Sequence, residues 1–423
     1  MPQATPAAAQ RKCSSPPRLW HADVVSVLSI NAGSSSIRFS FHAAGSPPAK
    51  LLDAKIERIG QGGTSLSLTE TGRAMDPPPR LAVDAADWHS AAVFLMGWLE
   101  AHPLFTDVQA VGHRVVHGMI HTSPERVTGA LLAELKAITP YDPEHLPREI
   151  ELIEAMGRRF PRLPQVACFD TAFHRSMPRV ATILPIPRRY QSRGVQRYGF
   201  HGLSYTFLLQ ELARSGDPAA ARGRVVMAHL GSGASLAAVR DGRCIDTSMG
   251  FTPASGLPMS TRSGDLDPGL MYFFALTEGM DAATFQNMTN HESGLLGLSE
   301  TSSDMRDLLA REREDVRAAE AVALFCYQAK KWIGAYAAAL GGLDTLVFAG
   351  GIGENSAPIR ARICDGLEFL GVELHAQRNA RHAPVVSSDA GGVAVRVIRT
   401  DEESVIAGLT IAALGLTVNG NAP

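Results

Sequence analysis

Three consecutive stretches near the start of the chain decide the fold: residues 24–30 (VVSVLSI), 31–36 (NAGSSS) and 37–42 (IRFSFH). The first stretch is short, apolar and rich in β-branched residues, which predicts a buried strand. The third alternates between apolar and polar residues as a paired strand does, and the small residues between the two predict a tight turn. The sequence therefore predicts a strand–turn–strand unit.

The same arrangement returns in the second half of the chain. Residues 225–230 (VVMAHL) are followed by 231–235 (GSGAS) and by 236–240, and the dipeptide Asp241-Gly242 is a hairpin signal. One such unit at the start of each half predicts two similar lobes that face each other.

Further along the chain, strands alternate with helices. A third glycine loop, 350–355 (GGIGEN), follows residues 346–349 (LVFA), so that a strand there leads into a helix. Apolar residues at helical spacing predict helices at 91–99, 131–137, 150–156 and 317–340, and a buried C-terminal helix within 405–418. This alternation is typical of an α/β fold.

Composition excludes several classes of protein. The 423 residues are 45% hydrophobic and 19% charged, which indicates a globular chain of two or more domains. The net charge of −2 gives no electrostatic footprint for nucleic acid or an anionic membrane. The longest apolar run, of about fourteen residues, is shorter than a membrane span requires. We therefore expect neither nucleic acid nor a membrane as a partner.

The cysteines and the N-terminus indicate the compartment. Five scattered cysteines, with no C-x-x-C pair, predict neither a disulfide framework nor a zinc site. Residues 1–23 lack the apolar stretch of a signal peptide, and we interpret them as a disordered extension. A cytoplasmic protein fits both observations.

The glycine turns provide the chemistry of a phosphate site. Small side chains and free backbone N–H groups can surround phosphate oxygens closely. Any one of these turns could be an ordinary hairpin, but three of them, each directly after an apolar strand, favour a nucleotide phosphate site. The sequence contains neither a G-x-x-x-x-G-K-[ST] loop nor a dinucleotide fingerprint.

Polar residues cluster in four otherwise apolar stretches, each of which we expect at the end of a strand. The stretches are 112–118 (GHRVVHG), 168–174 (CFDTAFH), 197–202 (RYGFHG) and 260–268 (STRSGDLDP). An arginine at such a position can bind a carboxylate or phosphoryl group through its planar fork. The alternative is a structural ion pair or a satisfied core histidine, which we favour for His113, His117 and His174.

Together these stretches resemble the acetate kinase family, within the acetate and sugar kinase/Hsp70/actin (ASKHA) superfamily. The matching segments follow family order from about residue 24 to 410: VLSINAGSSSIRFSF, GHRVVHG, FDTAFH, RYGFHGLS, HLGSGASLAAV, DTSMGFTPASGL, TRSGDLDPG, SSDMRDL, GGIGENS and TDEE. The resemblance implies an α/β fold of two duplicated, ribonuclease H-like lobes with the active site in the cleft between them.

The resemblance also implies how the chain is divided. Residues 24–170 plus 404–423 would form the N-terminal lobe, on the acyl and phosphate side, closed by the C-terminal helix. Residues 171–403 would form the C-terminal lobe, which binds the nucleotide and forms a homodimer.

By matching position, the resemblance assigns the site residues. The catalytic residues would be Asp170, Arg114, His201, Arg262 and His145. The acceptor would contact Arg114, Val116, Glu144, Phe200 and Pro253, the phosphate Ser34 and Ser36, and the metal Asn31 and Glu403. The ATP site would be formed by Arg38, His229, Leu230, Gly231, Ser232, Gly233, Asp304, Met305, Arg306, Gly351, Ile352, Gly353, Glu354 and Asn355. The cofactor would be Mg²⁺, or Mn²⁺ in its place.

The implied reaction is the reversible, in-line transfer of a phosphoryl group from ATP to acetate or a close analogue such as propionate. Because a carboxylate is already a nucleophile at pH 7, Asp170 would orient Arg114 and the substrate more than move a proton. The alternatives are a non-catalytic or regulatory nucleotide-binding protein, a kinase of another acyl acceptor, and, ranked last, an ATPase-type chaperone or sugar kinase.

Some positions depart from the family pattern. Ser232 replaces Asn in H-L-G-N-G, Arg38 replaces Lys, Ser260 replaces Gly and Met305 replaces Phe; Met119 and Ile120 replace the last two residues of H-G-G-E. Glu144 stands where the family's P-L-H-N-P has leucine, in the acceptor pocket. An unpaired carboxylate there costs stability. Either Glu144 turns outward, or the pocket takes a different acyl group.

Overall fold

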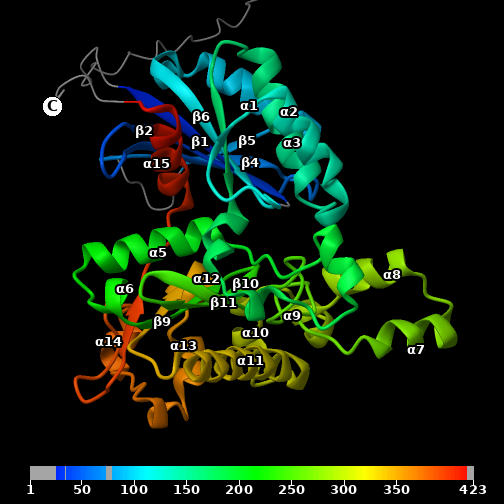
Figure 1. Cartoon of the computed structure of the whole chain (residues 1–423), viewed down its shortest axis with the longest axis vertical. Helices are drawn as coiled ribbons and strands as arrows, with labels where there is room; N and C mark the ends of the chain where they lie inside the picture. The colour runs from blue at the N-terminus through cyan, green and yellow to red at the C-terminus, as the bar shows by residue number, and fades with distance from the viewer. Residues whose placement is uncertain (1–24, 34, 73–78, 417–423) are drawn as a thin grey trace, which may run out of the picture.

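The computed structural model describes residues 25–33, 35–72 and 79–416, and its strands form two sheets (Figure 1). The first has the order β5-β4-β3-β2-β1-β6-β8-β7 and the second the order β11-β10-β9-β12-β13. The strands of the first sheet are β1 (Ser26–Ala32), β2 (Ser36–Ala43), β3 (Ala49–Glu57), β4 (Ser65–Glu70), β5 (Arg80–Ala82), β6 (Val108–Val115), β7 (Glu125–Arg126) and β8 (Gln165–Phe169). Those of the second are β9 (Arg224–Leu230), β10 (Ala234–Arg240), β11 (Arg243–Thr247), β12 (Thr345–Ala349) and β13 (Ala394–Val397).

The two sheets share one topology. In the first, β1, β2 and β3 are antiparallel neighbours, while β6 runs parallel to β1 and β8 parallel to β6. In the second, β9, β10 and β11 repeat the antiparallel meander, and β12 and β13 repeat the parallel strands. Tight turns can join only the antiparallel strands, and helices carry the parallel crossovers. The predicted duplication of the α/β unit is confirmed.

The opening strand has the predicted length of seven residues but begins and ends two residues later than predicted. β1 is buried on both faces and continues through Asn31 to Ala32, where it pairs with Ile37 of β2. The turn is therefore narrower than the predicted 31–36: Gly33 donates from its N–H to the Ser36 carbonyl oxygen at 2.8 Å, and Ser36 already belongs to β2. The predicted phosphate ligand Ser34 lies outside the described residues, as does the predicted extension 1–23.

Helices cover all five segments where apolar periodicity predicts them; four have wider bounds, and the C-terminal one runs from 402 to 414 instead of within 405–418. The described helices include several more than these five. They are α1 (Trp88–Ala101), α2 (Gly129–Ala137), α3 (Leu146–Arg159), α4 (Arg179–Thr182), α5 (Gly202–Arg214), α6 (Ala219–Arg222), α7 (Gly269–Glu278), α8 (Ala282–Asn287), α9 (Gly294–Ser299), α10 (Met305–Arg311), α11 (Val316–Leu340), α12 (Gly350–Asn355), α13 (Ala357–Cys364), α14 (Ala376–Ala380) and α15 (Glu402–Leu414). Two of the polar clusters lie elsewhere than predicted: His201 precedes α5, and Arg262 lies in a loop, so neither ends a strand.

The C-terminal helix returns to the first sheet. α15 packs on β1 and β6 (Figure 1). It lies so close that a Cβ atom on Gly112 of β6 would be 2.1 Å from Thr410 Oγ1, which explains the glycine there. The Asp401 side chain accepts a hydrogen bond from the Ser404 N–H and so caps the helix. As a result, the first turn of α15 lies at the edge of β1 where β1 ends.

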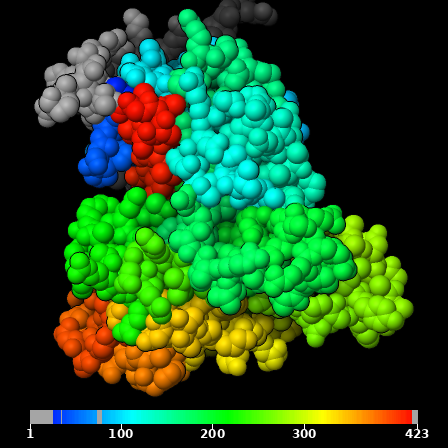
Figure 2. Space-filling view, in the orientation of Figure 1, coloured from blue at the N-terminus to red at the C-terminus, as the bar shows by residue number. Residues whose placement is uncertain are grey.

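The two sheets form the cores of the upper and lower halves in Figure 1, and the surface is hollowed between these halves in Figure 2. α5 lies at the junction, where it contacts both α15 and β9. None of the helices within the described ranges is long and apolar enough to cross a membrane.

Candidate active site

Arg114 and Asp170 meet because β6 and β8 are parallel neighbours. Arg114 is next to the end of β6, and Asp170 directly follows β8. Asp170 Oδ2 accepts from Arg114 Nε at 3.0 Å and from Nη2 at 2.7 Å. Arg114 Nη1 donates to the Ala32 carbonyl oxygen at 3.0 Å and to Glu149 Oε1 at 3.2 Å. These contacts fix the guanidinium and leave one Nη2 hydrogen without a partner among the described residues.

Two buried carboxylates keep Arg114 charged. Burial disfavours the guanidinium cation, but Asp170 and Glu149 outweigh this effect and raise the pKa of Arg114. Burial raises the pKa of Glu149 to about 8, against the opposing influence of Arg114. Glu149 was not predicted from the sequence, because nothing in the apolar spacing of α3 distinguishes it from the other charged residues of that helix.

His201 is held by a short chain of hydroxyl groups. Its Nδ1 lies 2.8 Å from Ser235 Oγ, which lies 2.5 Å from the Tyr205 hydroxyl oxygen. The ring stacks on His229 at a centroid distance of 4.3 Å. Burial, with His229 and Arg114 nearby, holds the pKa of His201 well below its usual range, so the imidazole is neutral. Ser235 and Tyr205 were not predicted.

Arg262 and His201 both lie at the glycine turn 231–235, one of the three predicted to bind phosphate and here called the phosphate loop. A Cβ atom on Gly233 would lie 3.2 Å from His201 Nε2 and 3.3 Å from Arg262 Nη2, so a side chain there would push these donors back by a few tenths of an ångström. Arg262 Nη1 donates to the Pro253 carbonyl oxygen at 2.7 Å. Burial, together with the charge of Arg114, lowers the pKa of Arg262. This corner of the cleft is thus electropositive and can bind an anion.

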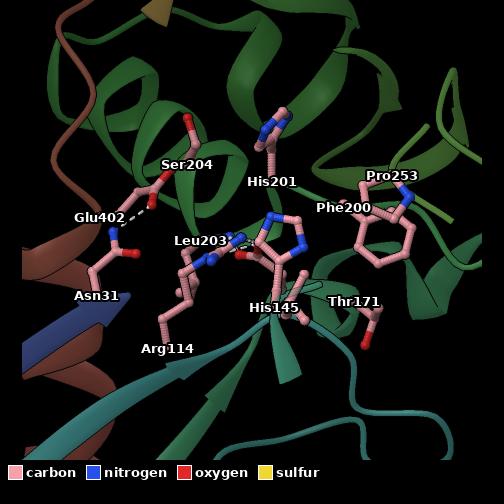
Figure 3. A network of polar contacts seen from close by, with 12 residues as sticks. Asn31, Arg114, His145, Thr171, Phe200, His201, Leu203, Ser204, Pro253 and Glu402 are labelled. Carbon is pink, nitrogen blue, oxygen red and sulfur yellow. Dashed lines mark hydrogen bonds and ion pairs between the residues drawn. The ribbon is translucent and has the colours of Figure 1, made fainter. Parts of the chain in front are cut away.

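His145 faces the same cleft from the start of α3 (Figure 3). Asp142 Oδ1 accepts from the His145 backbone N–H and lies 3.0 Å from its Nδ1. Because an ionised carboxylate only accepts hydrogen bonds, Nδ1 carries a proton and Nε2 is the atom left for a ligand. Asp142 is a positioning residue that the sequence did not reveal.

Asn31 lies between two glutamates of α15. Its Nδ2 donates to Glu402 Oε2 at 2.8 Å and to Glu403 Oε1 at 3.1 Å. The Asn31 Oδ1 atom points away from Glu402 into the cleft (Figure 3). The charges of Asp170 and Arg114 influence the pKa of Glu402. The charges of Arg38 and Asp53, near the sheet, influence that of Glu403.

Glu402, which is not among the predicted metal ligands, also contacts Asn31. Of the two glutamates only Glu403 was predicted, but Glu402 lies closer to Asn31 and is within electrostatic reach of Asp170 and Arg114. Burial, with Asp170 nearby, raises the pKa of Glu402 to about 7. The adjacent glutamates are equivalent in sequence, and only the direction of the first turn of α15 distinguishes them.

A cavity of about 670 Å³ lies beside the predicted phosphate loop. It is lined by eight of the residues predicted to bind ATP and by five further residues: Gly231, Ser232, Asp304, Met305, Arg306, Gly351, Ile352 and Asn355, with Ser260, Ser303, Leu309, Ser356 and Pro358. Its size and small-residue wall fit a nucleotide.

The other predicted ATP residues do not line this cavity. Leu230 is fully buried in β9. Glu354 Oε1 accepts from the N–H groups of Gly350 and Thr400, so it ties α12 to the start of α15. His229 Nδ1 lies 2.8 Å from Ser204 Oγ. Gly353, Gly233 and Arg38 also lie outside the lining, although Arg38 is within electrostatic reach of His229 and Glu403.

The acceptor side has a cavity of its own, of about 350 Å³. The predicted acceptor contacts Pro253 and Glu144 line it, as do the predicted catalytic residues His145 and Arg262, whereas the predicted acceptor contact Arg114 does not. Val116 and Phe200 are each 1% exposed and belong to the core beneath it, so they do not line this cavity. Glu144 does not turn away from the cavity, and its Oε1 accepts from Asn290 Nδ2 at 2.8 Å.

Comparisons with known proteins agree with one another. The family model described as the Acetokinase family matches residues 26–408. The chain is 42% identical to the acetate kinase of Methylocella silvestris over 92% of this chain and 98% of that one. It is 41% identical to the propionate kinase of Citrobacter rodentium over 90% of this chain and 95% of that one.

Solved structures give the same result. The crystal structure of Porphyromonas gingivalis acetate kinase superimposes with a TM-score of 0.81 at 34% identity, covering 92% of this chain and all of that one. A propionate kinase from Francisella tularensis gives 0.84 at 32%, covering 92% and 99%. These matches confirm the ASKHA-type fold that the motifs predicted. With a family model matched across nearly all of its length, this chain belongs to the acetokinase family.

Proposed function

We propose that this chain transfers the γ-phosphoryl group of ATP to acetate or propionate and forms an acyl phosphate and ADP. One observation carries the proposal: Arg262 and His201 Nε2 converge on Gly233, which follows the cavity-lining residues Gly231 and Ser232. The test is hydroxamate formation from the acyl phosphate with purified protein, ATP, Mg²⁺ and acetate or propionate. ATP binding without product from either acid would instead favour a regulatory nucleotide-binding protein.

In this mechanism the carboxylate oxygen of the acceptor attacks the γ-phosphorus while the bond to the bridging oxygen of ADP breaks. Arg114 and Arg262 bind the acceptor and the equatorial oxygens, and His201 and His145 donate to the same oxygens. Such a transfer needs positioning and charge stabilisation rather than a strong base. Asp170 keeps Arg114 in its orientation, as its two hydrogen bonds to the guanidinium suggest.

The chain offers oxygen ligands for Mg²⁺. Asn31 Oδ1 and the Glu402 carboxylate provide hard oxygen donors. Mg²⁺ prefers sites with few protein ligands, where water molecules and substrate phosphates complete its coordination. No cluster of three or more His, Cys, Asp or Glu within the described ranges could hold a metal alone. When bound, Mg²⁺ neutralises charge on the ATP phosphates.

We expect Glu402 to matter more for the metal than Glu403. Glu402→Gln removes the carboxylate that faces the cleft, so the Mg²⁺ concentration for half-maximal activity should rise by about tenfold or more. Glu403→Gln is the matched control, because it makes the same change at the neighbouring residue and should have a smaller effect. Titration of activity with Mg²⁺ measures both, and a larger effect at Glu403 would contradict the assignment.

The hydroxyl chain fixes which nitrogen of His201 carries the proton. Burial raises the pKa of Tyr205, so its hydroxyl stays protonated, and we assign it as the donor to Ser235 Oγ. We then assign the Ser235 hydroxyl as the donor to His201 Nδ1. The proton of the neutral imidazole is then on Nε2, the atom nearest the phosphate loop. His201 can thus donate to a phosphoryl oxygen without being charged.

Tyr205→Phe should change the pH profile as well as the rate. Without the phenol, Ser235 Oγ can accept from Nδ1–H, and Nε2 then donates only when His201 is protonated. Since the pKa of His201 is low, we expect kcat at pH 7.5 to fall about tenfold and to recover partly as pH falls toward 6. A wild-type profile in Tyr205→Phe would exclude this role.

We assign residues 24–170 with 404–423 to an N-terminal lobe and 171–403 to a C-terminal lobe. The packing of α15 on β1 and β6 supports this division.

We place the enzyme in the cytoplasm, because Cys168, Cys244, Cys326 and Cys364 are buried free thiols.

We also propose a homodimer formed through α7. Within the described ranges, α7 has no buried residue and projects from the side of the lower half (Figures 1 and 2). Large apolar side chains are exposed there: Tyr272 by 70%, Phe273 by 56% and Leu276 by 69%. Exposed apolar patches of this kind are typical of protein interfaces.

Charges on this face should separate the subunits. The double variant Phe273→Glu, Leu276→Glu should elute as a monomer in size-exclusion chromatography with light scattering, since it buries two carboxylates in an apolar interface. Val93→Glu changes an exposed apolar residue of α1 and should leave a dimer. A double variant that remains dimeric would place the interface elsewhere.

A further inference from the structure

The acceptor cavity has a polar far wall that a methyl group does not complement. From Arg262 and His145 the cavity extends to Glu144 and Asn290, which are contributed by opposite halves of the molecule. Thr252, Gln286 and Thr289 add further polar side chains to its lining. The apolar residues that line it include Phe251, Pro253 and Phe285.

The course of an acyl chain follows from which residues are closed off. Val116 and Phe200 are buried in the core and do not line this cavity. An acceptor whose carboxylate is bound by Arg262 therefore extends along Pro253 toward Glu144. The cavity volume of about 350 Å³ leaves room beyond a two-carbon acid.

Glu144 is positioned as a hydrogen-bond acceptor on this path. Asn290 Nδ2 lies 2.8 Å from its Oε1, and His291 Nε2 lies 3.3 Å from the same atom. Glu144 Oε2 has no partner among the described residues, and the side chain is 28% exposed, so a ligand can reach it. A carboxylate in this position weakens the binding of an acid that places a methyl group against it. It strengthens the binding of an acid that places a hydrogen-bond donor there.

We propose that Glu144 makes this enzyme favour short carboxylates that carry a hydrogen-bond donor, a hydroxyl or an ammonium group, one or two carbons from the carboxylate. This inference rests on the proposed function and extends its acceptor range. The reaction is unchanged: the acid's carboxylate oxygen forms the new bond to phosphorus, the bond to ADP breaks, and the donor group stays unmodified.

Isosteric acids test the proposal. Propionate, glycolate and glycine have equal numbers of heavy atoms, as do butyrate, 3-hydroxypropionate and β-alanine. We expect a donor-bearing acid to exceed its methyl isostere in kcat/KM by about tenfold in at least one set, the effect of one hydrogen bond to a charged group. The hydroxyl and ammonium acids of each set show which donor is preferred.

Substitutions at Glu144 assign the preference to this residue. Glu144→Leu should reduce the ratio of kcat/KM between donor-bearing and methyl acids to one or below. Glu144→Gln keeps an acceptor oxygen, so it should retain a preference for hydroxyl and lose one for ammonium. Glu151→Leu, a like change on the outer face of α3, should leave the ratio as in the wild type.

Three results separate the possibilities. The inference would be overturned if the enzyme preferred the methyl acids in both sets. It would also be overturned if Glu144→Leu left the ratio unchanged. In either case turnover of acetate and propionate would still uphold the proposed function. No product from any acid would overturn the proposed function itself. Each ratio compares the kcat/KM values of two acids on the same variant. A lower fraction of folded protein reduces both values equally and leaves the ratio unchanged.

Discussion

Arg262→Ala is expected to lower kcat by about 10³-fold, the effect of removing one preorganised donor from a developing charge. In the described structure Arg262 donates to one carbonyl oxygen, that of Pro253, and lies near Arg114. Glu144 and Asp142 offset part of its charge, but no carboxylate of the described residues forms an ion pair with it, so the guanidinium is available for an anion.

The same argument predicts that the fold survives. Removing this buried cation relieves its burial cost and its repulsion with Arg114 but loses its attraction to Glu144 and Asp142, so the thermal midpoint should change little. Arg262→Lys keeps the charge without the planar fork and should restore only part of the rate. Steady-state kinetics and a thermal melt measure the two effects, and near-normal turnover in Arg262→Ala would refute the role.

Asp170→Asn should reduce both turnover and stability. Asp170 accepts both bonds from the Nε and Nη2 side of Arg114. Both side chains are largely buried, with side-chain exposures of 12% for Arg114 and 1% for Asp170. Loss of one partner from a buried pair costs about 3–5 kcal/mol of unfolding free energy. We expect kcat to fall at least about 10²-fold as Arg114 leaves its orientation.

A second buried pair provides the control. Asp217 Oδ2 accepts from Arg396 Nε at 2.6 Å in the lower half, away from the lining of both cavities. Asp217→Asn makes the same chemical change and should lower stability while it leaves kcat per folded molecule unchanged. Denaturant unfolding and kinetics on both variants distinguish the cases. Equal kcat in Asp170→Asn and wild type would show that Asp170 is only structural.

Much of the site follows from local sequence. A short apolar strand before a glycine turn predicts both β1 and β9, because a buried strand needs a continuous apolar run. The resemblance then placed Arg114, Asp170, His201 and Arg262 in one site. In the structure hydrogen bonds and electrostatics link them, although Arg262 and His201 lie outside strands.

Other site residues carry no such pattern. Tyr205 and Ser235 serve His201 from separate elements, and the side chain of Glu149 reaches Arg114 from a helix whose apolar spacing is unremarkable in sequence. Their roles depend on atoms far apart along the chain that meet only when the elements pack.

By itself, the sequence determined the α/β class, the duplicated unit and the family, and it predicted the main anion-binding side chains, because strands, turns and motif residues occur in short continuous segments. Only the tertiary structure decided which of two adjacent glutamates faces the cleft and that Glu144 remains in the acceptor cavity. The physical reason is orientation: the angle of a helix start and the approach of a partner such as Asn290 arise from packing between distant segments.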